Sequence, residues 1–163
     1  MKVLLRLRDA LLTVPTWRDW QEEIVLLTLF GIIYLPIGFS LNFLKFQPES
    51  NWQTIIAVLF SSFWMPGVNE ELVFRGLLIP RTGSRKWAIA FSWLLFLVYH
   101  LHPFVPPFFR TPAFLIGAGL VGIVCTVSYL RSKSIWSAIV IHWSIVATWL
   151  LVLGGLDLFR LQR

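Results

Sequence analysis

The sequence predicts an all-α fold: a polytopic integral membrane bundle of about five transmembrane helices, preceded by an N-terminal interfacial amphipathic helix. Of the 163 residues, 57% are hydrophobic and only 13% are charged, and several apolar runs approach the roughly 20 residues that a helix needs to cross a bilayer. Many of the nine tryptophans stand near the ends of these runs, as in the aromatic belts of membrane proteins. The helices are therefore expected to associate in lipid through close packing and a few polar contacts.

Residues 1–23 form the first expected segment, in which basic and apolar positions alternate. A signal peptide would need a longer uninterrupted apolar stretch and a small-residue cleavage site. We therefore expect an interfacial amphipathic helix that stays in the mature protein. Residues 24–163 are expected to form a single transmembrane domain, because no internal repeat or second domain is apparent in them.

Five apolar stretches within this domain are expected to span the membrane, and they cover about residues 24–44, 52–80, 87–102, 112–130 and 135–155. The second is interrupted at Pro66, where proline removes a backbone donor and clashes with the preceding turn, so a kink or restart is expected. Asn69 is a candidate N-cap for the restarted helix. In the fourth, close spacing of three glycines indicates a tight helix contact, and these are Gly117, Gly119 and Gly122.

Lysine and arginine are distributed unevenly, with ten in the N-terminal segment and alternate connecting segments and four in the others. The positive-inside rule then places the N-terminus in the cytoplasm. These residues form no contiguous patch with stacking aromatics, which argues against nucleic acid as a partner and favours contacts with the lipid bilayer. A small chain without a targeting segment is expected in a bacterial plasma membrane. The single cysteine, Cys125, lies in an apolar run and is expected to be a packing residue.

Two adjacent glutamates, Glu70 and Glu71, lie in an almost wholly apolar stretch, whereas the other acidic residues lie in terminal or loop segments. Ionisable groups at membrane depth are costly, so a functional site is the first hypothesis. Two histidines, His100 and His142, also fall within apolar helices. We expect these side chains to converge on one intramembrane cavity, because an unpaired charge in lipid is unfavourable.

Helix geometry assigns different tasks to the two glutamates. Residues four apart share a face, so Glu71 and Arg75 are expected to form an ion pair, whereas Glu70 points about 100° away and stays free for chemistry. Phe96 and His100 have the same spacing, so the Phe96 ring can pack against the imidazole and orient it.

A carboxylate in an apolar cavity is suited to take a proton from water. Glu70 is therefore the candidate base, His100 can orient the water, and His142 can donate a hydrogen bond to a developing oxyanion. Attack of water on an amide is the candidate reaction. The sequence lacks the motifs of zinc proteases and serine hydrolases. No obligatory cofactor is expected, although ligand type alone leaves open a zinc site made of Glu70, His100 and His142.

The motifs resemble those of the CPBP (CAAX protease and bacteriocin-processing) intramembrane proteases, a family that includes the Ras-converting CAAX endopeptidase. The resemblance spans about residues 52–150, with the motifs in the correct order. The family motifs Glu-Glu-x-x-x-Arg and Phe-x-x-x-His and the first position of His-x-x-x-Asn are matched by Glu70, Glu71 and Arg75, by Phe96 and His100, and by His142.

The resemblance implies an intramembrane endopeptidase of the glutamic type, with a membrane protein, a lipidated protein or a peptide as its substrate. It implies that Glu70 and His100 activate water and that His142 supports the oxyanion. The supporting residues that it implies are Glu71, Arg75 and Phe96. Val146 departs from the asparagine of the third motif, and loss of one oxyanion donor can lower a rate about 100-fold to 1000-fold.

Two other classes of function stay open. The first is a non-catalytic member of the same fold, a binding or bacteriocin-immunity factor in which the polar network is only structural. The second is a small transporter subunit that uses intramembrane Glu and His as a proton relay, although no inverted repeat is apparent. The protease hypothesis requires Glu70 to lie within about one water of the two histidines.

Overall fold

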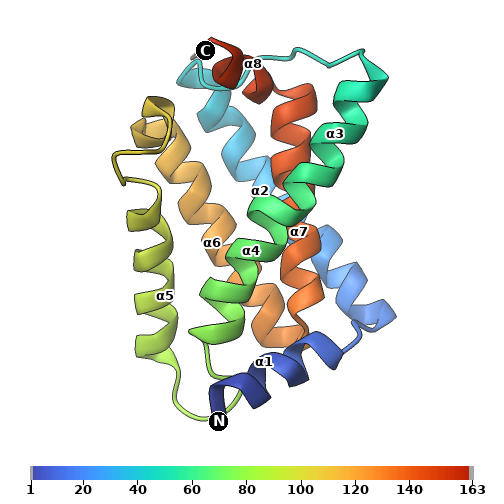
Figure 1. Cartoon of the computed structure of the whole chain (residues 1–163), viewed down its shortest axis with the longest axis vertical. Coiled ribbons are helices and arrows are strands. Elements are labelled where there is room, and N and C mark those ends of the chain that lie inside the picture. The colour runs from blue at the N-terminus through green and yellow to red at the C-terminus, as the bar shows by residue number, and fades with distance from the viewer. Residues whose placement is uncertain (1, 162–163) are drawn as a thin grey trace.

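The computed structural model describes residues 2–161, and within them it is built from helices, with one isolated backbone bridge between Gln47 and Leu153. The elements in chain order are α1 (Lys2–Leu12), α2 (Trp17–Ser40), α3 (Trp52–Ser62), η1 (Phe63–Val68), α4 (Asn69–Glu71), η2 (Leu72–Leu77), α5 (Lys86–Tyr99), η3 (Pro107–Arg110), α6 (Pro112–Ser132), α7 (Ile135–Val152) and α8 (Gly155–Arg160). The predicted all-α architecture is confirmed (Figure 1).

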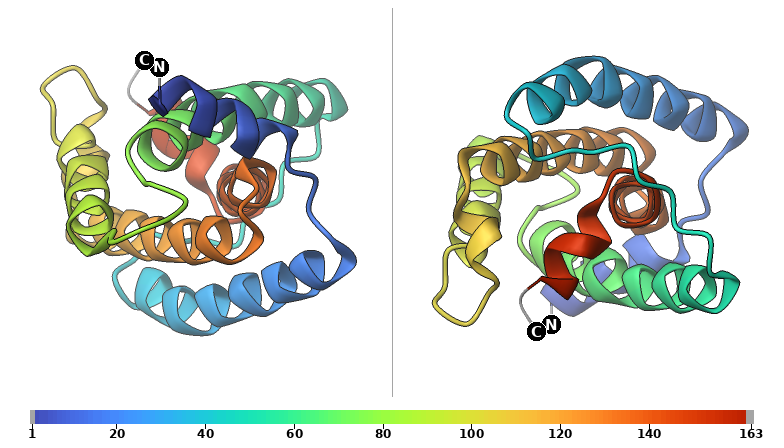
Figure 2. Two further views of the ribbon diagram at one scale, coloured as in Figure 1. Left: turned by 90° about the horizontal axis from the view of Figure 1, so that it is seen from below. Right: turned by 90° about the horizontal axis from the view of Figure 1, so that it is seen from above.

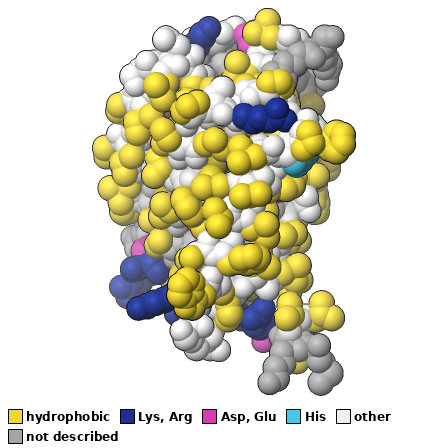
Figure 3. Space-filling view, turned by 90° about the vertical axis from the view of Figure 1, so that its left-hand side faces the viewer, with side chains coloured by type: hydrophobic (Ala, Val, Ile, Leu, Met, Phe, Trp, Pro, Cys, Tyr) yellow, Lys and Arg dark blue, Asp and Glu magenta, His cyan; other side chains and the backbone are white. Residues whose placement is uncertain are grey.

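Three of these helices, α2, α6 and α7, are long and apolar enough to cross a membrane. Two further apolar segments run beside them: α5, which has 14 residues, and residues 52–77, which form one helical segment interrupted near its middle. In the space-filling view, the face that carries α5 is apolar over most of its height (Figure 3). The chain is therefore an integral membrane helical bundle.

Helix α7 occupies the middle of the bundle and contacts α2, α3, α4 and α6. Seen along the long axis, α6 and α2 lie on one side of it and the segment 52–77 lies on the other (Figure 2). Helix α5 packs at the periphery against α6 and η2. This arrangement lets side chains from α4, α5 and α7 reach a common interior space.

Helix α1 lies across one end of the bundle, where it contacts η2 and α7 (Figure 1). Arg6 Nη2 donates a hydrogen bond to the carbonyl of Leu77 at 2.8 Å, and Trp136 Nε1 donates to the carbonyl of Leu11 at 2.8 Å. Its position across the bundle end agrees with an interfacial helix.

The first long helix begins at Trp17, seven residues before the Ile24 expected from hydropathy. A capping box starts it: the Thr16 side chain accepts from the Asp19 amide, and the Asp19 carboxylate accepts from the Thr16 amide at 2.7 Å. Residues 17–23, assigned from the sequence to the interfacial segment, are therefore the first turns of α2. Hydropathy misplaced the start because Glu22 and Glu23 are acidic residues. The helix accommodates both: Glu22 pairs with Arg131 at 2.6 Å, and Glu23 is buried.

The expected interruption at Pro66 is present. Met65 leaves the helical conformation, with φ −134° and ψ 108°, and the Met65–Pro66 peptide is cis. The helix has already restarted when it reaches Asn69, whose own backbone is helical, so the expected N-cap role of Asn69 is wrong. The first amides of a helix have no partner within it, so a proline there costs no helical hydrogen bond. The helix can therefore restart directly after Pro66.

The glycines of α6 make room for aromatic rings from two neighbouring helices. A Cβ atom on Gly117 would lie 2.6 Å from the Tyr34 ring of α2, and one on Gly122 would lie 2.9 Å from the Trp93 ring of α5. The Tyr34 hydroxyl donates a hydrogen bond to the Ala113 carbonyl of α6 at 3.0 Å. The tight contact expected on α6 exists, and it brings α2 and α5 against the same helix.

Candidate active site

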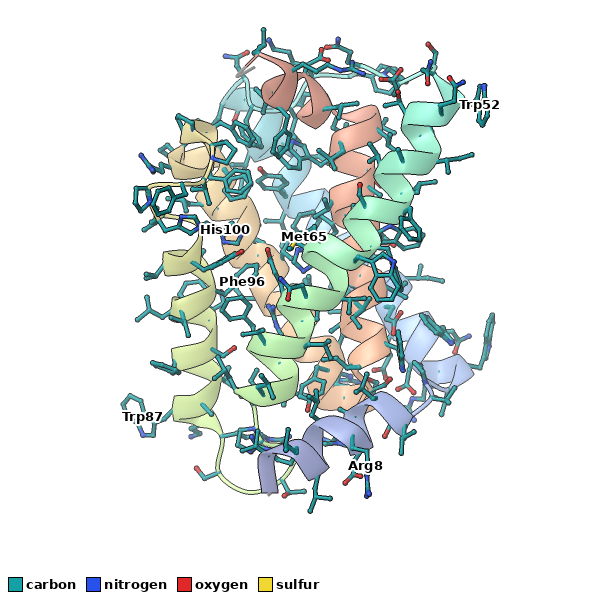
Figure 4. All side chains as sticks on the ribbon, in the orientation of Figure 1. Arg8, Trp52, Met65, Trp87, Phe96 and His100 are labelled. Carbon is teal, nitrogen blue, oxygen red and sulfur yellow. The ribbon has the colours of Figure 1, made fainter. Side chains whose placement is uncertain are left out.

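Glu70, His100 and His142 line one cavity of about 350 Å³ in the interior of the bundle. They come from α4, from the end of α5 and from α7, and all three side chains are buried. Figure 4 shows His100 and Phe96 on the α5 side, with Met65 of the broken segment facing them. The structure therefore brings together the three side chains that the sequence predicted to converge.

Glu71 and Arg75 form the expected ion pair beside this cavity. Arg75 Nη1 donates to Glu71 Oε1 at 2.9 Å, and both side chains are completely or almost completely buried. Arg75 Nη2 donates to the Gly122 carbonyl of α6 at 2.9 Å. The guanidinium also lies 4.8 Å from the centre of the Phe96 ring, a distance typical of a cation–π contact. Arg75 thus ties its helix to both α5 and α6.

His142 makes a contact with Glu71 that the sequence did not predict. Its Nδ1 lies 2.7 Å from Glu71 Oε1, the same oxygen that Arg75 contacts. An ionised carboxylate can only accept hydrogen bonds, so the proton is assigned to Nδ1 from the network. Nε2 of His142 lies 3.9 Å from Glu70 Oε2, too far for a direct hydrogen bond but close enough for one water to bridge.

His100 is held in the same tautomer by its own helix. Its Nδ1 lies 2.8 Å from the Phe96 carbonyl, and a carbonyl only accepts, so Nδ1 carries the proton and Nε2 keeps its lone pair. The Phe96 ring packs against the imidazole with the centroids 4.9 Å apart, as expected. Helix α5 ends at Tyr99, however, so His100 caps the helix and does not lie inside it as the sequence predicted. Pro103, three residues later, limits further helix.

Among residues 2–161, the Oε2 atoms of both Glu70 and Glu71 are buried without a hydrogen-bond partner, and the two glutamates differ at the other oxygen. Glu71 Oε1, in contrast, accepts from two donors. Burial of an unpaired carboxylate is costly, so such a group requires water, a proton or a ligand. Glu70 is thus the member of the acidic pair that is left free to bind water or a ligand.

Two sets of side chains contain residue types that bind metals. Ligand atoms of Glu71, Cys125 and His142 lie within 4.8 Å of one another, but Arg75 already places a positive charge 2.9 Å from the Glu71 oxygen. That set does not suit a cation. The set predicted from the sequence, Glu70 with the two histidines, suits zinc by ligand type, because each imidazole keeps Nε2 available while Nδ1 is hydrogen-bonded.

The remaining cavity wall is mostly apolar and aromatic. Val146 lies on this wall one turn beyond His142, so the position of the missing third-motif donor does face the site. The aromatic side chains that line the space include Phe30, Tyr34, Phe43, Tyr99, Phe109, Phe114, Trp149 and Phe159.

In a comparison with protein-family models, residues 50–148 match the family described as type II CAAX prenyl endopeptidase Rce1-like. No curated protein and no solved structure matches the chain. The matched region contains every residue of the acid–base network described above, from Glu70 to His142.

Proposed function

The chain belongs to the Rce1-like family of type II CAAX prenyl endopeptidases, and on that premise we propose that it is an intramembrane endopeptidase of the glutamic type. It hydrolyses a peptide bond with water activated by Glu70 and His100, and it needs no obligatory metal. One observation carries the proposal: Glu70, whose buried Oε2 has no hydrogen-bond partner among residues 2–161, shares a cavity with two histidines whose Nδ1 atoms are already engaged.

The charges of the network support a base at Glu70. The network has no net charge when a single proton is held by either Glu70 or His142, because Glu71 and Arg75 cancel each other. Glu70 Oε2 and His142 Nε2 lie 3.9 Å apart. With the proton on His142, Glu70 is an ionised base, and the imidazolium is stabilised by Glu71 as in other carboxylate–histidine pairs.

The reaction then follows from these positions. Glu70 removes a proton from water as the water oxygen bonds to the carbonyl carbon, while the His100 Nε2 lone pair orients the water. The carbonyl oxygen becomes an oxyanion and accepts a hydrogen bond from His142 Nε2. When this intermediate collapses, the C–N bond breaks and Glu70 transfers its proton to the leaving amine.

The surroundings of the site favour a substrate from the membrane. The cavity wall is rich in aromatic rings, which suits an apolar segment of a membrane protein, a lipidated protein or a peptide. We propose an orientation with the N-terminus in the cytoplasm, because lysine and arginine are concentrated on that side. The bacterial plasma membrane remains the proposed location.

A cleavage assay tests the function. The protein in proteoliposomes is incubated with a mixture of apolar and lipidated peptides, and new termini are identified by mass spectrometry. Glu70→Gln and His100→Ala should abolish cleavage while thermal unfolding in detergent stays close to that of the wild type. Glu23→Gln and His102→Ala are matched controls, because neither residue lines the cavity. Wild-type cleavage rates in Glu70→Gln would refute the proposal.

A non-catalytic binding or immunity role is the second candidate, and Val146 is the observation that favours it. Without a donor at this position, the network can persist as structure alone. That role predicts no cleavage by the wild type and a loss of folding in both Glu70→Gln and His100→Ala.

A further inference from the structure

The proposed reaction leaves the oxyanion with one hydrogen bond from His142, because the next position on that face of α7 is Val146. Stabilisation of an oxyanion depends on donors that are already in place, and each is worth about 100-fold to 1000-fold in rate. A second donor must therefore come from another part of the cavity wall.

Most other side-chain donors on this wall are already engaged or sealed. The Tyr34 hydroxyl donates to a backbone carbonyl at 3.0 Å, and the His100 Nδ1 proton is directed to the Phe96 carbonyl. Trp149 Nε1 is buried, has no hydrogen-bond partner among residues 2–161, and belongs to an indole that packs against Gly155. None of these groups can reach a substrate carbonyl in the cavity.

Tyr99 is the remaining donor. It lines the cavity, 39% of its surface is exposed, and its hydroxyl has no hydrogen-bond partner among residues 2–161. Its ring centroid lies 5.4 Å from that of His100 and 5.8 Å from that of Phe74. Phe74 follows Glu70 by one turn of the same helical segment, so Tyr99 packs against the segment that carries the base.

We infer that the Tyr99 hydroxyl donates the second hydrogen bond to the oxyanion and thereby replaces the donor that Val146 lacks. The tyrosine keeps its proton, and no covalent bond to it forms or breaks. The hydrogen bond strengthens only as negative charge develops on the carbonyl oxygen, so it acts on kcat more than on KM. This inference rests on the proposed function and assigns to α5 a task that the third family motif places on α7.

The test measures steady-state cleavage of the best peptide from the proteoliposome assay. Tyr99→Phe should lower kcat about 100-fold to 1000-fold, with KM within about twofold of the wild-type value. Tyr129→Phe is the matched control, because the Tyr129 hydroxyl also has no hydrogen-bond partner in the described part of the chain, and Tyr129 does not line the cavity. It should leave both constants unchanged.

A second substitution separates a role in the oxyanion site from a structural one. Val146→Asn introduces an amide donor on α7. In the double variant with Tyr99→Phe, kcat should therefore be at least about tenfold higher than in Tyr99→Phe alone. A purely structural role of Tyr99 predicts no such rescue.

Two results would overturn the inference: a kcat of Tyr99→Phe within about threefold of wild type, or no rescue by Val146→Asn in the double variant. If Glu70→Gln is inactive while Tyr99→Phe retains full activity, only the role of Tyr99 fails. If Glu70→Gln is itself active, both the proposed function and the role of Tyr99 are refuted.

Discussion

His142 Nδ1 lies 2.7 Å from Glu71 Oε1, although the two residues are 71 positions apart in the chain. The same oxygen accepts a hydrogen bond from Arg75 at 2.9 Å. Glu71 therefore does more than pair with Arg75 within one helix: it also orients the imidazole of α7 towards Glu70. The two adjacent glutamates act on the same histidine from opposite ring nitrogens.

Substitution of Glu71 by alanine should destabilise the protein strongly. It removes the carboxylate from Arg75, whose side chain is almost completely buried, and an uncompensated buried charge costs about 3–5 kcal/mol. Unfolding of the purified protein in mixed micelles, titrated with denaturing detergent, measures this change.

The adjacent position provides the control for that experiment. Glu70→Gln keeps the size of the side chain and removes a buried carboxylate that, unlike Glu71, accepts no side-chain hydrogen bond among residues 2–161, so its unfolding free energy should equal or exceed that of the wild type. Equal losses for Glu71→Ala and Glu70→Gln would contradict the division of roles between the two glutamates.

The loop between α2 and α3 should weaken in acid. The amide of Asn51 and the guanidinium of Arg160 hold the pKa of Glu49 below its ordinary value of 4.5. Because the folded-state pKa is depressed, this contribution to stability is present above the ordinary pKa and is lost as the pH falls through the lower, folded value. Thermal unfolding of wild type and Glu49→Gln, compared between about pH 3 and about pH 7, measures the effect.

In that comparison, the stability of Glu49→Gln should lie below that of the wild type near neutral pH and approach it in acid. Glu22 also pairs on the surface, with Arg131 at 2.6 Å, so both proteins share any acid sensitivity that comes from that pair. Parallel curves over the whole range would show that Glu49 contributes nothing.

Alanine at Gly117 should disturb the packing of α2 on α6. The new Cβ would lie 2.6 Å from the Tyr34 ring, and overpacking of this kind costs about 1–3 kcal/mol. Gly31→Ala is the control, since its Cβ would meet Leu35 at an ordinary 3.8 Å and alanine is the better helix former. A Gly117→Ala protein as stable as Gly31→Ala would contradict the close contact.

Metal removal should leave both stability and cleavage unchanged. Arg75 lies 2.9 Å from the Glu71 oxygen, so the set of Glu71, Cys125 and His142 does not suit a cation, and the proposed water activation uses only protein groups. The zinc content of purified protein, measured by elemental analysis, should be far below one ion per chain and unchanged in His142→Ala. Stoichiometric zinc that is lost in Glu70→Gln and His100→Ala would instead assign these residues as ligands.

The features that the sequence predicted correctly are mostly local. The Glu71–Arg75 pair and the packing of Phe96 on His100 both join residues four apart, so the period of the helix alone places them together. The interruption at Pro66 follows from the missing amide of one residue. The start of α2 was predicted incorrectly, although its signal is also local. Thr16 and Asp19 form a capping box that is visible in the sequence, but the prediction followed hydropathy instead.

Sequence by itself determined the helical membrane fold, the apolar spans and the groups available for chemistry, because hydropathy and helical period depend on neighbouring residues alone. Only the tertiary structure decided that His142 contacts Glu71, that Arg75 reaches the Gly122 carbonyl, and that Tyr99 shares the cavity of Val146. These contacts join different helices. They depend on how each helix is rotated and packed against its neighbours, which no periodicity within a single helix specifies.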